Sequence, residues 1–170
     1  MTLLGVKLSN DLTWEMHVSH IIRKAQGRLF TLNMLRRARV SGKDIFQIFC
    51  SKIRPVLEYA SPVWHPGLTQ EQSDDIENIQ VRACKIAFPM LAYEAALNEC
   101  DEPTLKERRF TQCEQFFLKI QCPSDKLHRI LPSVRENVRN TRNSIKFPLP
   151  KTYTNRYKNS FLPYVLYNCQ

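Results

Sequence analysis

Apolar residues return every three or four positions along three long stretches of the chain, at about residues 13–38, 41–61 and 69–88. That spacing places the apolar side chains of each stretch on one face of a helix. Three amphipathic helices with short connections bury those faces against one another, so the pattern predicts a mainly α protein built on a three-helix bundle. The residues predicted to share its core are Val40, Ile45, Phe49, Ile53, Leu57, Ile76, Ile79 and Ala83.

Residues that cap helix N-termini stand before each of these stretches. A side-chain oxygen at such a position accepts a hydrogen bond from a backbone N–H of the first turn, and an acidic or amide side chain three residues later can return the bond. The caps therefore support three separate helix starts. They are Thr13 for the first helix, Ser41 with Asp44 for the second, and Thr69 with Gln72 for the third.

Two prolines shape the second helix. Pro55 has no N–H and its ring clashes with the carbonyl one turn earlier, so the helix is expected to kink near residues 51–55. Pro62 disfavours the α conformation of the residue before it, so the helix is expected to end at Ser61. The pattern thus predicts a kinked and mostly buried central helix.

Shorter elements flank the predicted bundle. Residues 3–8 predict a short strand or hairpin. Because a lone strand leaves backbone groups unpaired, its pairing partner is expected to be missing or to come from elsewhere. Residues 93–99 and 104–121 predict further C-terminal helices, with one or two helical turns at 125–131. Beyond Pro132 a polar, basic and proline-spaced sequence predicts a largely irregular tail. The predicted divisions are a remnant strand of an upstream domain (1–12), the bundle (13–89), a helical extension (90–131) and the tail (132–170).

The net charge of +9 is concentrated towards the C-terminus. Residues 123–170 hold nine Lys or Arg against two acids, a net +7, whereas residues 1–122 hold sixteen against fourteen, a net +2. A near-neutral folded part with a basic tail is typical of proteins that bind polyanions, although the same charge also serves solubility. Aromatic residues in the tail could dock on the bundle or stack on nucleic-acid bases. They are Phe147, Tyr153, Tyr157, Phe161 and Tyr164.

The cysteines and the hydropathy of the chain indicate its compartment. The six cysteines, at positions 50, 84, 100, 113, 122 and 169, form no close pair, and we expect them to be reduced. No apolar run is long enough to cross a bilayer, and the N-terminus lacks the layout of a signal peptide. We therefore expect an intracellular protein, nuclear or cytoplasmic, that is neither secreted nor bound to a membrane.

Patterns that would indicate catalysis are missing. The adjacent carboxylates Asp74 and Asp75 are expected in the first turn of the third helix, where the helix dipole favours acids. His17 and His20 lie three residues apart, but no cysteine pair completes a four-ligand zinc site. No serine or cysteine stands in a glycine-flanked nucleophile turn. The residues therefore predict no enzyme activity, no metal and no cofactor for this chain.

Basic residues outside the apolar faces are candidate phosphate contacts. Cationic side chains on a rigid helix can bind a nucleic-acid backbone without reading its sequence. From the residues alone, a merely solvated charged face is an equal alternative. The candidates are Arg23, Lys24 and Arg28 on the first helix, Lys52 and Arg54 on the second, and Arg82 and Lys85 on the third.

Residues 53–64, with the sequence IRPVLEYASPVW, resemble a hallmark segment of the reverse transcriptases of non-LTR retrotransposons, of the LINE type and jockey-like. Neighbouring segments agree in order and spacing, at residues 4–6 and 12–14 before it and 68–89 and 155–161 after it. The resemblance therefore covers nearly the whole chain. Its hallmark positions are Gly5, Trp14, Arg54, Pro55, Leu57, Glu58, Tyr59, Pro62 and Trp64.

In that family this segment follows the catalytic palm and belongs to a helical thumb that grips the primer–template duplex. The resemblance implies that residues 13–89 are a thumb-like module from the C-terminal part of an RNA-directed DNA polymerase, expected to bind an RNA–DNA or DNA duplex non-specifically. The family's catalytic aromatic-x-Asp-Asp motif is absent here, so Mg²⁺ is expected only for the full-length parent. The missing upstream polymerase region is then a second expected partner, and no small-molecule substrate is expected. The alternative is a stand-alone helical protein-interaction module with no nucleic-acid role.

Overall fold

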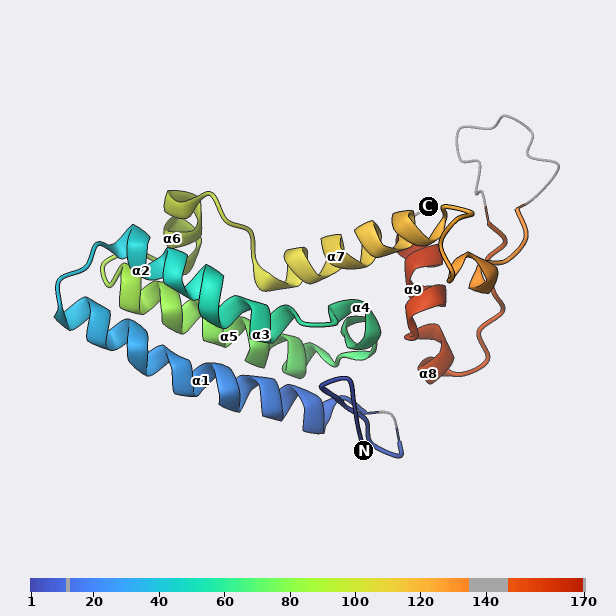
Figure 1. Cartoon of the computed structure of the whole chain (residues 1–170), viewed down its shortest axis with the longest axis horizontal. Helices are drawn as coiled ribbons and strands as arrows, with labels where there is room; N and C mark the ends of the chain where they lie inside the picture. The colour runs from blue at the N-terminus through green and yellow to red at the C-terminus, as the bar shows by residue number, and fades with distance from the viewer. Residues whose placement is uncertain (12, 135–146, 170) are drawn as a thin grey trace. The chain divides into compact units, whose positions relative to one another are not determined.

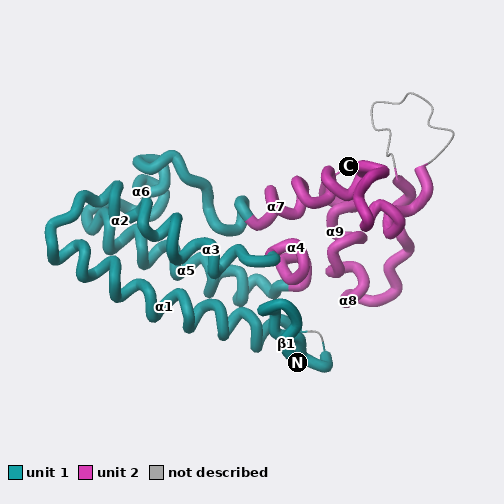
Figure 2. Tube along the Cα trace, viewed as in Figure 1, with its two compact units in different colours: residues 1–60, 68–108 teal, residues 61–67, 109–170 magenta. Residues whose placement is uncertain are grey.

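The computed structural model of the protein describes residues 1–11, 13–134 and 147–169, and the chain forms two compact units (Figure 2). Unit 1 comprises residues 1–60 and 68–108, and unit 2 comprises residues 61–67 and 109–170. The regular structure of the described residues is helical apart from one short hairpin, which confirms the predicted mainly α class. The chain passes between the two units after residues 60, 67 and 108, whereas the divisions predicted from the sequence lie after residues 12, 89 and 131.

Three helical segments form the body of unit 1, as the apolar pattern predicts (Figure 1). The first and third segments run in the same direction and the second runs antiparallel to both. The segments pack against one another, and a further helix, α6 (Tyr93–Cys100), packs on the third. The first segment is α1 (Glu15–Arg37), the second is α2 (Gly42–Ile48), η1 (Phe49–Ile53) and α3 (Arg54–Glu58), and the third is α5 (Gln70–Ala87).

The core of unit 1 contains nearly all of the residues predicted for it. Seven of them are no more than 1% exposed: Ile45, Phe49, Ile53, Leu57, Ile76, Ile79 and Ala83. Val40 is only half-buried because it lies in the connection between α1 and α2, after Arg39 with a φ of +58°. α1 adds its own buried stripe, which consists of Val18, Ile21, Ala25, Leu29 and Leu32.

The predicted kink at Pro55 takes the form of a π-helical turn. The backbone N–H of Arg54 donates to the carbonyl of Phe49, five residues back. A wider turn at this point changes the register of the hydrogen bonds just before a residue that has no N–H to donate. The predicted end of the helix was wrong, because the helix stops at Glu58 and Ser61 begins α4 (Ser61–Trp64). Pro62 is tolerated there because N–H groups in a first helical turn need no partner within the helix.

Two of the three predicted caps are confirmed. Ser41 Oγ accepts a hydrogen bond from the N–H of Asp44 at 3.2 Å. Thr69 and Gln72 form a reciprocal capping box, with bonds of 3.2 and 3.1 Å. Thr13, the third, does not cap α1, since its N–H and hydroxyl both donate to the carboxylate of Asp11 and the helix begins after Trp14.

The N-terminal segment is a hairpin whose two strands, β1 (Thr2–Leu3) and β2 (Val6–Lys7), pair with each other. The expectation that the partner strand is missing or comes from elsewhere was therefore wrong. Gly5 makes the turn possible because it adopts a φ of +85°, a conformation that side-chain-bearing residues rarely adopt.

Unit 2 forms around the C-terminal part of α7 (Leu105–Ile120), from Arg109 onwards. α9 (Phe161–Asn168) packs against both α4 and the 3₁₀ turn η2 (His65–Gly67), and α8 (Asn155–Lys158) packs against α9. A further 3₁₀ turn, η3 (His128–Ile130), lies where one or two helical turns are predicted. The buried core of the unit consists of Cys113, Phe117, Ile120, Phe147, Val165 and Leu166.

The prediction of a largely irregular tail was wrong for residues 155–168, which form α8 and α9; residues 135–146 lie outside the described residues. Apolar side chains at helical spacing supply the reason, because Phe161, Val165 and Leu166 pack within unit 2. Of the tail aromatics, Tyr153 and Tyr157 are exposed and the others pack in this unit. All six cysteines are free thiols, as expected.

Candidate nucleic-acid interface

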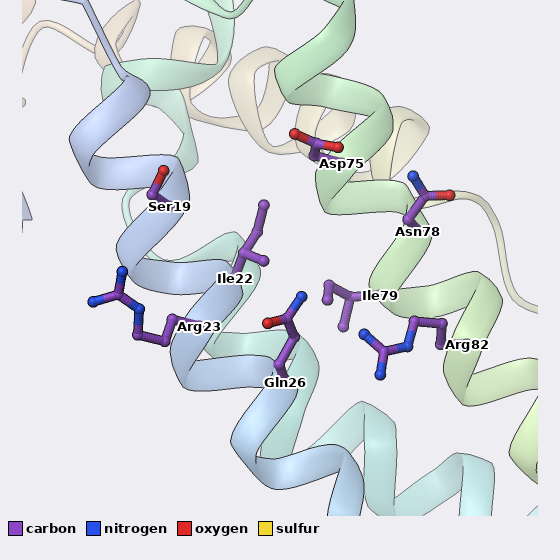
Figure 3. A pocket seen from close by; sticks show the side chains of 8 residues that line it. All are labelled: Ser19, Ile22, Arg23, Gln26, Asp75, Asn78, Ile79 and Arg82. Carbon is purple, nitrogen blue, oxygen red and sulfur yellow. The ribbon is translucent and has the colours of Figure 1, made fainter.

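A polar groove with a volume of about 450 Å³ runs between α1 and α5 on the surface of unit 1 (Figure 3). Two arginines from different helices line it together with two primary amides. One acid, Asp75, lies near the end of the groove where Ser19 lies, away from Gln26 and Arg82. The residues that line the groove are Ser19, Ile22, Arg23 and Gln26 from α1, and Asp75, Asn78, Ile79 and Arg82 from α5.

The helical period explains why α1 presents these polar groups to the groove. Ser19, Arg23 and Gln26 are spaced by four and three residues, so they lie along one edge of the helix. The buried stripe of α1 occupies a different face and holds the helix against the core. The edge at the groove is therefore positioned by packing that does not involve the polar residues themselves.

Four of the candidate cations on α1 and α5 are exposed, and two of them, Arg23 and Arg82, line the groove. Within the described parts of the chain, no ion pair or hydrogen bond engages the side chains of Arg23, Lys24, Arg82 or Lys85. Lys85 follows Arg82 by three residues, one turn further along α5. An approaching anion would thus meet two cationic helix edges without first breaking an ion pair.

Lys24 and Arg28 lie on another edge of α1, away from the groove. Lys24 lines a separate cavity of about 350 Å³ between the hairpin, α1 and α3. The guanidinium of Arg28 donates to the backbone carbonyl of Lys52 in the π-helical turn. Arg28 therefore has an intramolecular role, and the side chain of Lys52 remains exposed beside it.

Arg54 does not have the exposed position that a phosphate contact requires. Its guanidinium forms an ion pair with Glu102 at 2.7 Å, and its side chain is only 14% exposed. Arg108 binds the buried carboxylate of Glu58 through two bonds of 2.5 and 3.2 Å and also approaches Glu102 at 3.7 Å. Arg54 thus belongs to an ion-pair network that fixes α3 to the segment leading into α7.

The hallmark residues of segment 53–64 have structural roles within each unit. In unit 1, the hydroxyl of Tyr59 donates to the carbonyl of Leu4 at 3.0 Å, beside the turn at Gly5, and Leu57 is fully buried. In unit 2, Trp64 is fully buried. The segment therefore supplies anchors to both units.

The histidines and the aspartate pair form no joint site. His17 is buried and its Nδ1 accepts a hydrogen bond from the N–H of Lys7 at 3.4 Å, whereas His20 is exposed. Burial lowers the pKa of the His17 imidazole, and the nearby charges of His20 and Lys7 lower it further. A slight loss of hydration and the nearby charge of Lys7 also lower the pKa of His20. Asp74 and Asp75 lie in the second turn of α5 and not in the first. Among the residues whose positions are described, no group of three or more His, Cys, Asp or Glu side chains could hold a metal ion.

The sequence pattern did not identify the amides Gln26 and Asn78 as part of a site. The spacing of polar residues along one edge of α1 includes Gln26 and could have indicated a site. To recognise that site, however, one must know that α5 lies beside this edge. Arg23 and Arg82 are the only two candidate cations that the structure brings together in this groove, among the residues it describes.

No protein-family model, curated protein or solved structure matches the sequence. In the described parts of the chain, no helix combines the length and the apolar character needed to cross a bilayer.

Proposed function

We propose that unit 1 binds nucleic-acid duplexes non-specifically through their phosphate backbone, as the thumb-like module of an RNA-directed DNA polymerase of the non-LTR retrotransposon type. The observation that carries this proposal is the groove between α1 and α5, where Arg23 and Arg82 lie exposed on two rigid helices. The chain has no catalytic role of its own in this proposal. The upstream polymerase region would supply the metal-binding carboxylates and Mg²⁺.

The charge of α1 supports binding by the folded unit as well as by the tail. The helix holds five Lys or Arg against one Glu, a net +4, although residues 1–122 together carry only +2. Such cations attract the phosphate backbone whatever the base sequence, and they release counterions as they bind. The amides of Gln26 and Asn78 can add hydrogen bonds to phosphate or sugar oxygens, which fix position without specifying sequence.

The test compares two double variants of the whole chain that remove the same charge. Arg23→Ala with Arg82→Ala removes the groove cations, and Lys151→Ala with Lys158→Ala removes two exposed cations of unit 2. Fluorescence anisotropy with labelled RNA–DNA and DNA duplexes gives the affinity as a function of salt concentration. On B-form DNA each phosphate bound by a cation contributes about 0.9 to the slope of log K against log salt, so the slope should be smaller by about 1.8 in the groove variant.

The expected result is weaker binding and a flatter salt slope for the groove variant, with a smaller effect for the control. Equal losses in both variants would contradict the proposal, because they would indicate plain polyelectrolyte attraction. The whole chain is required because a chain ending at Cys122 would lack α9, which packs against α4 in unit 2.

A second candidate function, a helical protein-interaction module, is favoured by one observation. α1 exposes large apolar side chains, with Met16 at 58%, Phe30 at 66% and Met34 at 48%. Exposed apolar groups on a helix can mark a site of contact with another protein. If the groove variant binds duplexes as tightly as the unchanged protein, this candidate becomes the better account of α1.

A further inference from the structure

Phe30 is a large aromatic side chain that the fold does not use. It is 66% exposed, in the regular part of α1. Its neighbours Leu29 and Leu32 are 2% and 0% exposed and already anchor this turn of the helix in the core. Packing therefore does not require an aromatic residue at this position.

Phe30 continues the polar edge of α1 that lines the groove. Positions 19, 23, 26 and 30 are spaced by four, three and four residues, so they follow one another along the same edge. Side chains four residues apart on a helix are neighbours, which places the ring beside Gln26 and within two turns of Arg23. α5 runs parallel to α1 (Figure 1), so the turn that bears Lys85 follows Arg82 in the direction of Phe30.

We propose that this edge binds single-stranded nucleic acid, with one unpaired base stacked on Phe30 and the adjoining phosphates held by Arg23 and Arg82. A cationic groove next to an exposed aromatic ring is the arrangement that binds single strands without sequence preference. The base faces inside a duplex are covered by their neighbours in the stack, so only an unpaired base can stack on the ring. The inference rests on the proposed function and deepens it, because it predicts that the surface favours a strand with unpaired bases over a blunt duplex.

The test uses Phe30→Leu in the whole chain, because leucine retains an apolar side chain but has no aromatic face. The probes are a labelled single strand, a blunt duplex and the same duplex with a short single-stranded extension, each followed by anisotropy. A 2-aminopurine in the single strand reports stacking through quenching of its fluorescence. Tyr153→Leu is the matched control, because Tyr153 is an aromatic residue of unit 2 that is 87% exposed.

We expect Phe30→Leu to weaken single-strand binding about tenfold, within the range measured for stacking of one base on an aromatic side chain. The same variant should abolish the quenching that accompanies binding, remove the preference for the extended duplex and leave affinity for the blunt duplex unchanged. Tyr153→Leu should change none of these quantities. Amide hydrogen exchange of α1 should be the same in Phe30→Leu and the unchanged protein, since the side chain is exposed.

Three outcomes would overturn the inference. They are unchanged single-strand binding in Phe30→Leu, an equal loss on the blunt duplex, or a loss that appears in Tyr153→Leu instead. The variant Arg23→Ala with Arg82→Ala separates these outcomes from failure of the proposed function. If that variant loses affinity for all three probes while Phe30→Leu has no effect, only the stacking inference fails. If the unchanged protein binds none of the probes, both proposals fail.

Discussion

Two glycines of unit 1 allow the same substitution to be tested in opposite surroundings. Gly27 lies in the middle of α1, and a Cβ added there would meet no atom within 4 Å. Its backbone is helical, so alanine introduces no strain. Alanine is favoured over glycine inside a helix by about 0.8–1.0 kcal/mol, and no packing contribution alters that value here. Gly27→Ala should therefore stabilise unit 1 by about 1 kcal/mol.

Gly42, the first residue of α2, is the counterpart. A Cβ there would lie 2.7 Å from the carbonyl oxygen of Ala87 and 2.7 and 2.9 Å from two ring carbons of Phe88. Real Cβ atoms do not approach other atoms so closely, so α2 or the end of α5 must move. Forcing an extra carbon into a packed site typically costs about 1–3 kcal/mol. Gly42→Ala should therefore destabilise the same unit.

Amide hydrogen exchange measured by mass spectrometry on peptides of α1 and α5 reports unit 1 separately from unit 2. A change of 1 kcal/mol alters the population of the open state about fivefold, which exchange rates resolve. We expect slower exchange in Gly27→Ala and faster exchange in Gly42→Ala. If amide exchange becomes slower in both variants, or faster in both, the atoms around the added carbon do not determine its effect on stability. The reasoning from close contacts is then refuted.

Two further predictions concern the core and the pH dependence of stability. Ile53→Ala should lower the free energy of unfolding by about 2–5 kcal/mol, because the side chain is 1% exposed. A decrease below about 0.5 kcal/mol in urea melts would place Ile53 outside the core. Burial, with the positive charge of His20 and Lys7, lowers the pKa of His17 below its ordinary 6.5, so the unfolded chain binds the proton more readily. The stability that His17 contributes is thus complete above pH 6.5 and is lost as the pH falls through the folded-state pKa. His17→Asn, which keeps an acceptor near the position of Nδ1, should flatten the loss of stability below pH 6.5 in urea melts, and an unchanged pH dependence would contradict this assignment.

Rules that use only residues close together in the sequence predicted most of the helical segments of unit 1. The apolar period identified its three helical segments, and the capping residues at Ser41 and Thr69 were correct because a cap depends on atoms within four residues. The same rules failed at Thr13, where the carboxylate of Asp11 competes for the same threonine. They also failed at Ser61, because a proline that ends one helix can equally stand in the first turn of the next.

The roles of the cations could not be predicted from spacing. Arg54 and Arg23 both stand outside the apolar faces, yet Arg54 meets Glu102, which lies 48 residues further along the chain. Arg28 likewise donates to a backbone carbonyl in the π-helical turn, 24 residues further along the chain. Which cations stay exposed depends on contacts between distant segments, and the hydrophobic period of one helix does not report them.

The division of the chain into discontinuous units has a consequence for folding during synthesis. Unit 1 has all of its residues once position 108 has been made, whereas unit 2 needs α9 to cover α4 and η2. His65 and its partner Tyr164 are 99 residues apart in the sequence. At about 5–20 residues per second, that separation corresponds to roughly 5–20 s of synthesis. Trp64, fully buried in the finished unit, spends that interval without α9, so a chaperone that recognises exposed aromatic residues would have its longest opportunity at this segment.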